Sequence, residues 1–205
     1  MARSTKRRKL RRTVAVVGDG QTERIYFSDI RDTDRPKNLS IFPDYPRKIG
    51  SYQGVLERAI ELAGDYDTVF ALIDLDKVIQ DKQQPVYARE KRVAEASGVT
   101  VLENNPCFEI WLLLHFQFSG KSFDNCGEVV RELAKKKCLP GYDKSEKYLS
   151  NARLYKSLRH LIETKAIPNA KLLENGEDDK NLLYPKAQIF KFFEWYFLYK
   201  SYSDK

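Results

Sequence analysis

Apolar residues alternate over the first hundred positions between short continuous runs and longer stretches with helical spacing. Short apolar runs are typical of strands buried on both faces of a parallel sheet, and the spaced stretches predict amphipathic helices that cover it. This order of strands and crossover helices predicts an α/β fold with a parallel-sheet core sandwiched by helices. The strands are predicted at 13–17, 38–42, 67–76 and 99–102, and the helices at 22–32, 52–63 and 86–96.

The pattern changes after about residue 120, where helical and basic segments dominate. The last of these segments is strongly aromatic, and aromatic residues at helical spacing are expected to close a core or to meet a partner protein. We expect a basic arm at 1–12, a core at 13–120 and a helical extension at 121–205 that packs on the core. Within the extension, helical spacing recurs at 125–137, 151–165 and 187–199, and a polar loop is predicted at 168–181.

The composition is that of a globular protein, because 42% of the 205 residues are hydrophobic, enough for one sizeable core. No apolar run reaches membrane-spanning length, and the amino terminus lacks the apolar segment of a secretory signal. A cytoplasmic protein without a membrane partner is therefore expected. The three cysteines, Cys107, Cys126 and Cys138, show no C-x-x-C spacing and are expected to be reduced thiols.

The net charge of +7 comes entirely from the first twelve residues. Seven of the 36 lysines and arginines lie there with no acidic residue, and the other 29 equal the 29 aspartates and glutamates. Such an arm is expected to be disordered when free and to attract the phosphate backbone of nucleic acid; the alternatives are a solubilising tail or docking on an acidic partner. The candidate nucleic-acid ligands are Lys6, Arg7, Arg8, Lys9, Arg11 and Arg12.

Two carboxylates follow the most apolar of the predicted strands. Residues 69–73 form an unbroken apolar run, and Asp74 and Asp76 emerge at its carboxyl end, where open α/β sheets bind their ligands. Carboxylate oxygens are ligands that Mg²⁺ and Mn²⁺ prefer. The pair predicts a metal site, although aspartates are also common in the turns that follow strands.

A second acidic pair, Asp19 and Glu23, follows the first predicted strand. In the sequence GDGQTE at 18–23 the glycines favour a sharp turn, Thr22 is a candidate N-cap, and Glu23 falls in the first helical turn. Turn chemistry and the helix dipole are the plainer explanation of the two acidic residues. Because the carboxyl ends of parallel strands meet at one edge of a sheet, the pair is also predicted to face Asp74 and Asp76 across one cleft.

Glu109 is an isolated carboxylate in the almost entirely apolar stretch after the fourth predicted strand. Pro106 suits the first turn of a helix there, with Asn104 or Asn105 as the cap. A carboxylate in such surroundings is costly unless it is paired, protonated, bound to metal or turned to a polar cleft. Glu109 is therefore predicted to point at the same cleft as the aspartates. His115 is expected to be a core or helix-end residue.

Three stretches together resemble the RloB-like family of prokaryotic defence proteins: VVGDGQTERIYF at 16–27, FALIDLD at 70–76 and NNPCFEIWLLLHF at 104–116. The family looks like a branch of the Toprim fold, related to the nuclease domains of OLD-family proteins. The resemblance implies a Mg²⁺- or Mn²⁺-dependent nuclease with metal ligands Asp19, Glu23, Asp74 and Asp76, and with Glu109 as a further catalytic residue. Asp19 stands where Toprim-like enzymes usually carry Glu.

The resemblance also implies a biological role. Family proteins resemble effectors of antiphage, abortive-infection systems that act on DNA or RNA, tRNA included, beside an ABC- or AAA-type ATPase. Physical chemistry agrees with the metal assignment, because five carboxylates in one cleft would repel each other strongly without cations. Two ions about 3.5 to 4 Å apart can activate water and stabilise the leaving oxygen of a phosphodiester.

Two other functions are compatible with the sequence. The segment DLDKV at 74–78 fits the D-x-D-x-[TV] motif of haloacid-dehalogenase-like phosphatases, with Asp178 and Asp179 as a later acidic pair. This motif lies behind two β-α units, however, and no apolar strand leads into Asp178. The chain is also compatible with a non-catalytic Toprim-like module that binds nucleic acid or the ATPase, and with a homo-oligomer.

Overall fold

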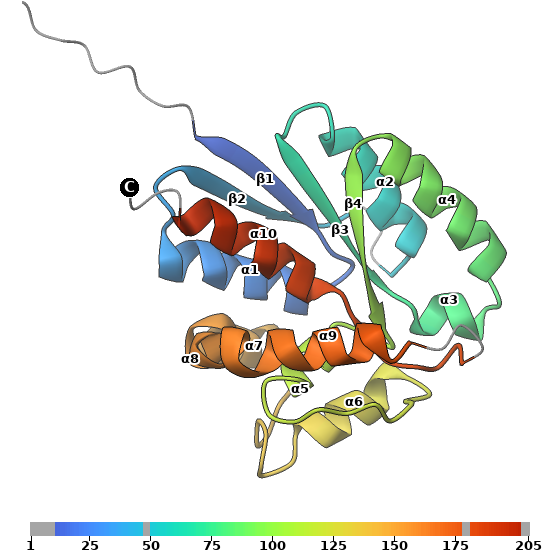
Figure 1. The fold of residues 1–205 in the computed structure, drawn as a ribbon, viewed down its shortest axis with the longest axis vertical. Helices are drawn as coiled ribbons and strands as arrows, with labels where there is room; N and C mark the ends of the chain where they lie inside the picture. Colours follow the sequence, from blue (N-terminus) through green and yellow to red (C-terminus); the bar gives the residue numbers. More distant parts are fainter. Residues whose placement is uncertain (1–10, 47–49, 178–180, 202–205) are drawn as a thin grey trace, which may run out of the picture.

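The computed structural model describes residues 11–46, 50–177 and 181–201 (Figure 1). Its centre is a five-stranded sheet in the order β2-β1-β3-β4-β5, in which the first four strands are parallel and β5 is antiparallel to β4. The predicted α/β fold class is confirmed, and the arrangement is consistent with a Toprim-like fold. The strands are β1 (Arg12–Val17), β2 (Leu39–Asp44), β3 (Thr68–Asp74), β4 (Val99–Asn105) and β5 (Lys186–Ala187).

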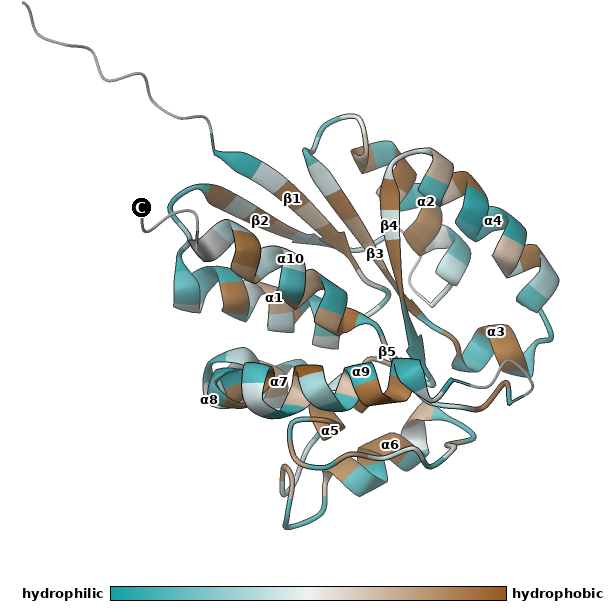
Figure 2. Ribbon diagram, in the orientation of Figure 1, coloured by the Kyte–Doolittle hydropathy of each residue, from teal (hydrophilic) through white to brown (hydrophobic). Residues whose placement is uncertain are grey.

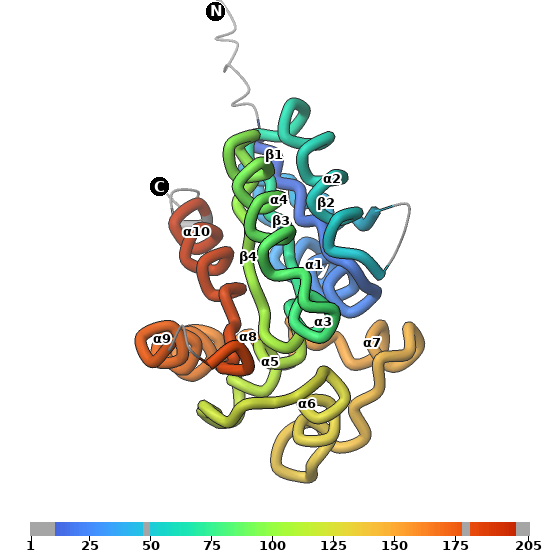
Figure 3. Tube along the Cα trace, turned by 90° about the vertical axis from the view of Figure 1, so that its right-hand side faces the viewer, coloured from blue at the N-terminus to red at the C-terminus, as the bar shows by residue number. Residues whose placement is uncertain are grey.

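Helices lie on both faces of the sheet and beyond the carboxyl ends of its strands (Figures 1 and 3). α2 (Tyr52–Leu62) and α4 (Gln84–Ala96) cover one face, and α1 (Gln21–Asp34) and α10 (Ile189–Ser201) cover the other. The helices from α5 to α9, which come later in the chain than the four parallel strands, lie beyond the carboxyl ends of these strands. The remaining helices are α3 (Asp76–Gln80), α5 (Glu109–Leu113), α6 (Cys126–Leu133), α7 (Glu146–Ala152), α8 (Leu154–Leu161), the π-helix η1 (Ile162–Ala166) and α9 (Ile167–Asn175).

Each face of the sheet has its own apolar core, which explains why the strands are apolar at consecutive positions. Phe70 and Leu72 of β3 point to the core beneath α1 and α10, and Val69 and Ala71 point to the core beneath α2 and α4. Figure 2 shows the hydrophobic residues concentrated along β1, β3 and β4. The aromatic residues of α10 belong to the first core, where Phe192, Phe193 and Tyr196 are fully buried, so this helix closes the core.

Two strands extend further than the sequence predicts. β2 continues through Pro43 to Asp44 because it is an edge strand, where the missing N–H of proline costs no ladder hydrogen bond. β4 continues to Asn105 because its last residues pair with β3 and β5. Asn104 and Asn105 are therefore strand residues, and the prediction that one of them caps a helix is wrong. The helix that follows, α5, has only five residues and begins at Glu109.

The carboxyl-terminal part also differs from its prediction, most clearly at α9 and β5. The predicted polar loop at 168–181 contains α9, which forms because Ala170 and Leu173 reach the core as buried residues. The two residues of β5 add an antiparallel strand to the sheet, which no local pattern predicted. Within the part of the chain that the structure describes, no helix is long and apolar enough to cross a membrane.

Candidate active site

A cavity of about 710 Å³ lies at the carboxyl ends of β1 and β3. Four of the predicted carboxylates line it. Asp19 comes from the turn after β1, Glu23 from the first turn of α1, Asp74 from the end of β3 and Asp76 from the start of α3. Glu109 is buried and is not a lining residue. The structure thus brings four of the five predicted side chains to one space, and their catalytic and metal-binding roles stay predictions.

Gly18 and Gly20 leave room for the side chain of Glu23 at the start of α1. A Cβ atom at Gly18 would lie 2.8 Å from Glu23 Cβ, and one at Gly20 would lie 3.1 Å from Glu23 Oε2. Gly20 is the N-cap of α1 and has an extended backbone with φ −137°. Close approach, rather than a left-handed conformation, is therefore the reason for glycine here. The predicted N-cap Thr22 lies inside the helix instead.

Substituting Gly18 by Ala is expected to displace Glu23 and to weaken any metal-dependent activity of the cavity. A misplacement of about 1 Å costs up to about 10²-fold in rate, and overpacking costs about 1–3 kcal/mol of stability. The measurements are the cleavage rate and the urea midpoint. Gly64→Ala is the matched control, because a Cβ at Gly64 meets nothing within 4 Å. Equal behaviour of the two variants would contradict the steric argument.

Asp19 and Asp76 also order the backbone around the cavity. Asp19 Oδ1 accepts hydrogen bonds from the N–H groups of Gly50 at 2.6 Å and Ser51 at 3.2 Å, which ties the start of α2 to the β1–α1 turn. Asp76 Oδ1 accepts a hydrogen bond from the N–H of Lys77 at 2.7 Å. The Lys77 ammonium in turn donates to the carbonyl oxygen of Gly50 at 3.3 Å. Asp19 thus contacts Gly50 directly, and Asp76 is connected to Gly50 through Lys77.

Glu109 is buried behind the cavity, and its carboxylate has both hydrogen-bond donors and a cation as partners. Its Oε1 accepts hydrogen bonds from the Thr22 hydroxyl at 3.3 Å and the Tyr142 hydroxyl at 3.0 Å. The ammonium of Lys144 lies 2.9 Å from the same oxygen. The two hydroxyl donors and the paired ammonium group offset the cost of burying this carboxylate. Glu109 therefore contacts two residues that line the cavity, Thr22 and Lys144.

Lys144 is a site residue that the sequence analysis missed. It lies between α6 and α7, and its ammonium group reaches the cavity. Burial alone would lower the pKa of Lys144, but the carboxylates of Glu109, Glu23 and Asp74 outweigh burial and raise that pKa. The side chain thus stays protonated. No local signal marks it, because a lysine in a polar and basic segment is common, and only the folding of α6 and α7 places it here.

The electrostatics of the cavity favour a cation. Burial, and then the neighbouring Glu109, raise the pKa of Glu23 to about 7. Burial, followed by Glu23 and Glu109, raises the pKa of Asp74 well above its usual range. Lys144 offsets part of this repulsion for both groups. A set of carboxylates that resist ionisation beside each other fits a hard divalent cation such as Mg²⁺ or Mn²⁺, which would remove the repulsion.

Asn104 lies next to Asp74 on the neighbouring strand. The two residues are paired in the register of β3 and β4, two positions beyond the pair Leu72 and Leu102. Side chains alternate along strands, so Asp74 and Asn104 lie on the same face as these two leucines, the face toward α1. The side-chain amide of Asn104 is buried and has no hydrogen-bond partner among the described residues. A buried amide of this kind is available to a ligand or a water bound beside Asp74.

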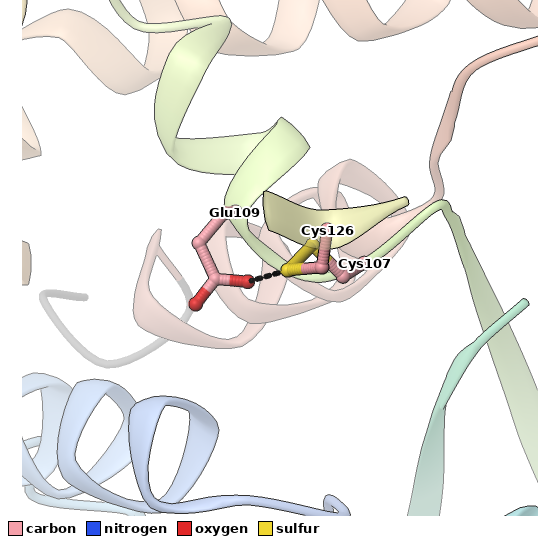
Figure 4. Close-up of side chains that lie close together, drawn as sticks. All are labelled: Cys107, Glu109 and Cys126. Atoms are coloured by element: carbon pink, nitrogen blue, oxygen red, sulfur yellow. Dashed lines mark hydrogen bonds between the residues drawn. A yellow bond between two sulfur atoms is a disulfide. The ribbon is translucent and has the colours of Figure 1, made fainter. Parts of the chain in front are cut away.

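The cysteines next to Glu109 correct one prediction. Cys107 and Cys126 form a disulfide, so two of the three cysteines are not reduced thiols; Cys138 is a free, buried cysteine. Figure 4 shows this disulfide beside the carboxylate of Glu109, whose Oε2 lies 3.2 Å from Cys126 Sγ. The pairing joins segments 19 residues apart, and local spacing does not reveal it.

The same three side chains are a possible metal-binding group, because their ligand atoms lie within 4.8 Å of one another. Thiolates are the form in which cysteine binds metal ions, and a disulfide has none. The group of Cys107, Glu109 and Cys126 therefore does not fit a metal ion in this oxidation state. Among the described residues it is also the one group of three such side chains this close together, so no three of the cavity carboxylates bring their oxygens within 4.8 Å of one another.

The other predicted residues that the structure describes, Arg11, Arg12 and His115, do not line the cavity. Lys6, Arg7, Arg8 and Lys9, and the acidic pair Asp178 and Asp179, lie outside the described residues. Arg12 is the first residue of β1 and donates to the Tyr199 hydroxyl at 2.7 Å, while Arg11 donates to the carbonyl oxygen of Lys37. His115 is a core residue, as expected: burial lowers its pKa to about 4, so it is neutral at pH 7.

Comparison with known proteins identifies the family. A family model described as RloB-like protein matches residues 14–194. The chain belongs to the RloB-like family. The matched range contains all the carboxylates of the site together with Lys144 and Asn104, so the whole cavity of this RloB-like protein lies within the family region. Neither the curated proteins nor the solved structures gave a match.

Proposed function

We propose that this RloB-like protein is a Mg²⁺- or Mn²⁺-dependent nuclease that hydrolyses phosphodiester bonds of DNA or RNA, tRNA included. The observation that carries the proposal is the cavity itself, in which four of the predicted carboxylates and the protonated Lys144 share the carboxyl end of a parallel sheet. Open α/β sheets bind their ligands at this edge. The raised pKa values of Glu23 and Asp74 further support a cation among these oxygens.

Each side chain has a role in the proposed reaction. Asp19, Glu23, Asp74 and Asp76 would hold the divalent ions. When bound, such ions activate water and stabilise charge on the leaving oxygen of a phosphodiester. The protonated ammonium group of Lys144, which lines the cavity, would bind a phosphate oxygen of the substrate. Buried Glu109 keeps that ammonium in place.

The proposed setting is antiphage defence by abortive infection. Family membership supports an effector that works beside an ABC- or AAA-type ATPase, with the ATPase controlling when nucleic acid is cleaved. The basic arm at 1–12 would hold the substrate through its phosphates, because its attraction does not depend on sequence. A cytoplasmic location fits both partners.

The direct test is cleavage of supercoiled plasmid DNA and of bulk tRNA by the purified full chain. Each substrate is incubated with Mg²⁺, with Mn²⁺ and with EDTA, in the presence and absence of an ATPase encoded beside the gene. Cleavage that needs the divalent ion supports the proposal and names the substrate class. No cleavage under any condition, with binding to nucleic acid or ATPase intact, would favour the non-catalytic module. Turnover of a small phosphomonoester without action on nucleic acid would favour the phosphatase.

A further inference from the structure

A groove with three arginines lies along the edge of the sheet, away from the cavity. Its volume is about 350 Å³, and it runs between the last turn of α1 and the start of β2, two elements that pack side by side (Figure 1). Arg11, Arg31 and Arg35 line it, and all three are exposed. We call these residues, with Ser40 and Phe42 of β2, the α1–β2 groove.

The groove keeps a positive balance after its internal ion pair is counted. Asp32 also lines it and lies 2.8 Å from the guanidinium of Arg31. Three guanidinium groups thus stand against one carboxylate among the lining residues. Arg35 is the C-cap of α1, and its Nε–H donates to the carbonyl oxygen of Asp32 at 3.3 Å. Guanidinium groups in this number are suited to phosphate oxygens.

The helix α1 connects this groove to the cavity. Its first turn carries Glu23, a cavity residue, and its last turn carries Arg31. Arg24 lies seven residues before Arg31, which is two helical turns, so the two arginines lie on the same face of α1. The Arg24 guanidinium lies 5.0 Å from the ring centre of exposed Tyr45, just after β2. Two arginine side chains and one tyrosine ring therefore lie along α1 between the cavity and the groove.

We infer that the phosphate backbone of a nucleic-acid strand lies along this face of α1, from the cavity to the α1–β2 groove. The eleven steps along the chain from Arg24 to Arg35 span about 16 Å, the length of about five nucleotides along one strand of a duplex. Tyr45 is placed to stack on a base near the cavity. Arg11 belongs to the basic arm at 1–12 and also lines the groove. The inference deepens the proposed function, because it states how the substrate of the same cavity is held.

The test compares two double variants of the full chain that lose the same charge. Arg31→Gln/Arg35→Gln removes two cations of the groove. Arg89→Gln/Arg92→Gln removes two exposed cations of α4, on the opposite face of the sheet. Binding to a fluorescein-labelled 20-base-pair DNA and to a 20-nucleotide RNA is followed by anisotropy in EDTA over a range of NaCl concentrations, which separates binding from metal-dependent cleavage.

The groove variant is expected to bind about tenfold more weakly, and its slope of log affinity against log salt should fall by about 1.4 to 1.8, the value for two lost phosphate contacts. The α4 variant should bind like the wild type. Equal effects of the two double variants, or no binding by the wild type, would overturn the inference. A groove-dependent binding without any metal-dependent cleavage would retain the inference and reject the nuclease. Metal-dependent cleavage by the wild type, together with unchanged binding by the groove variant, would support the nuclease and overturn the inference.

Discussion

Asp74→Asn is expected to abolish metal-dependent cleavage while making the metal-free protein more stable at pH 8. The carboxylate lies at the end of β3 in the cavity, where burial and the charges of Glu23 and Glu109 oppose its ionisation. The amide is nearly isosteric and uncharged, so it removes this repulsion and also removes a proposed metal ligand. Several kcal/mol of transition-state stabilisation by metal ions correspond to about 10³-fold or more in rate.

Two measurements on one protein preparation check this prediction. The first is the cleavage rate with Mg²⁺, and the second is the urea midpoint in EDTA at pH 8. Asp65→Asn is a suitable control, because Asp65 is exposed and lies before β3, at the opposite end of that strand from Asp74. A loss of cleavage together with a lower midpoint would indicate damage to the fold. Full cleavage by Asp74→Asn would remove the metal-ligand role of this residue.

The metal-free protein is expected to lose stability as the pH rises from about 5.5 to 8, and Glu23 is expected to cause part of that loss. Its pKa is about 7 in the folded protein against an ordinary value of 4.5. Between these values the folded state holds a proton that the unfolded chain has released, so rising pH favours unfolding. For these two pKa values the Glu23 contribution falls by about 2 kcal/mol between pH 5.5 and 8.

Urea denaturation in EDTA at several pH values measures this dependence directly. Glu23→Gln should remove about that amount of the pH dependence, because the amide does not titrate. Added Mg²⁺ should raise the midpoint more at pH 8 than at pH 5.5, since protons and the cation compete for the same oxygens. The same pH dependence in the wild type and in Glu23→Gln would show that the carboxyl group of Glu23 is not held protonated in the cavity.

The sequence by itself determined the four parallel strands of the sheet and the positions of its acidic edge. Strands buried on both faces must be apolar at consecutive residues, so the pattern from Val69 to Ile73 predicted β3 without any tertiary information. The carboxyl ends of parallel strands necessarily meet at one edge, which is why Asp19, Glu23, Asp74 and Asp76 were expected in one cleft and do line one cavity. These inferences need only local periodicity and the parallel order of the strands.

The tertiary structure alone decided the features that join distant segments. Lys144 reaches the cavity because α6 and α7 fold beyond the carboxyl ends of the strands, and nothing in its own neighbourhood of the chain records that path. The reason for glycine at Gly18 is the nearby Cβ of Glu23, which approaches the Gly18 backbone this closely only once α1 has formed. The disulfide of Cys107 with Cys126 and the short strand β5 likewise depend on long-range packing, which local spacing cannot encode.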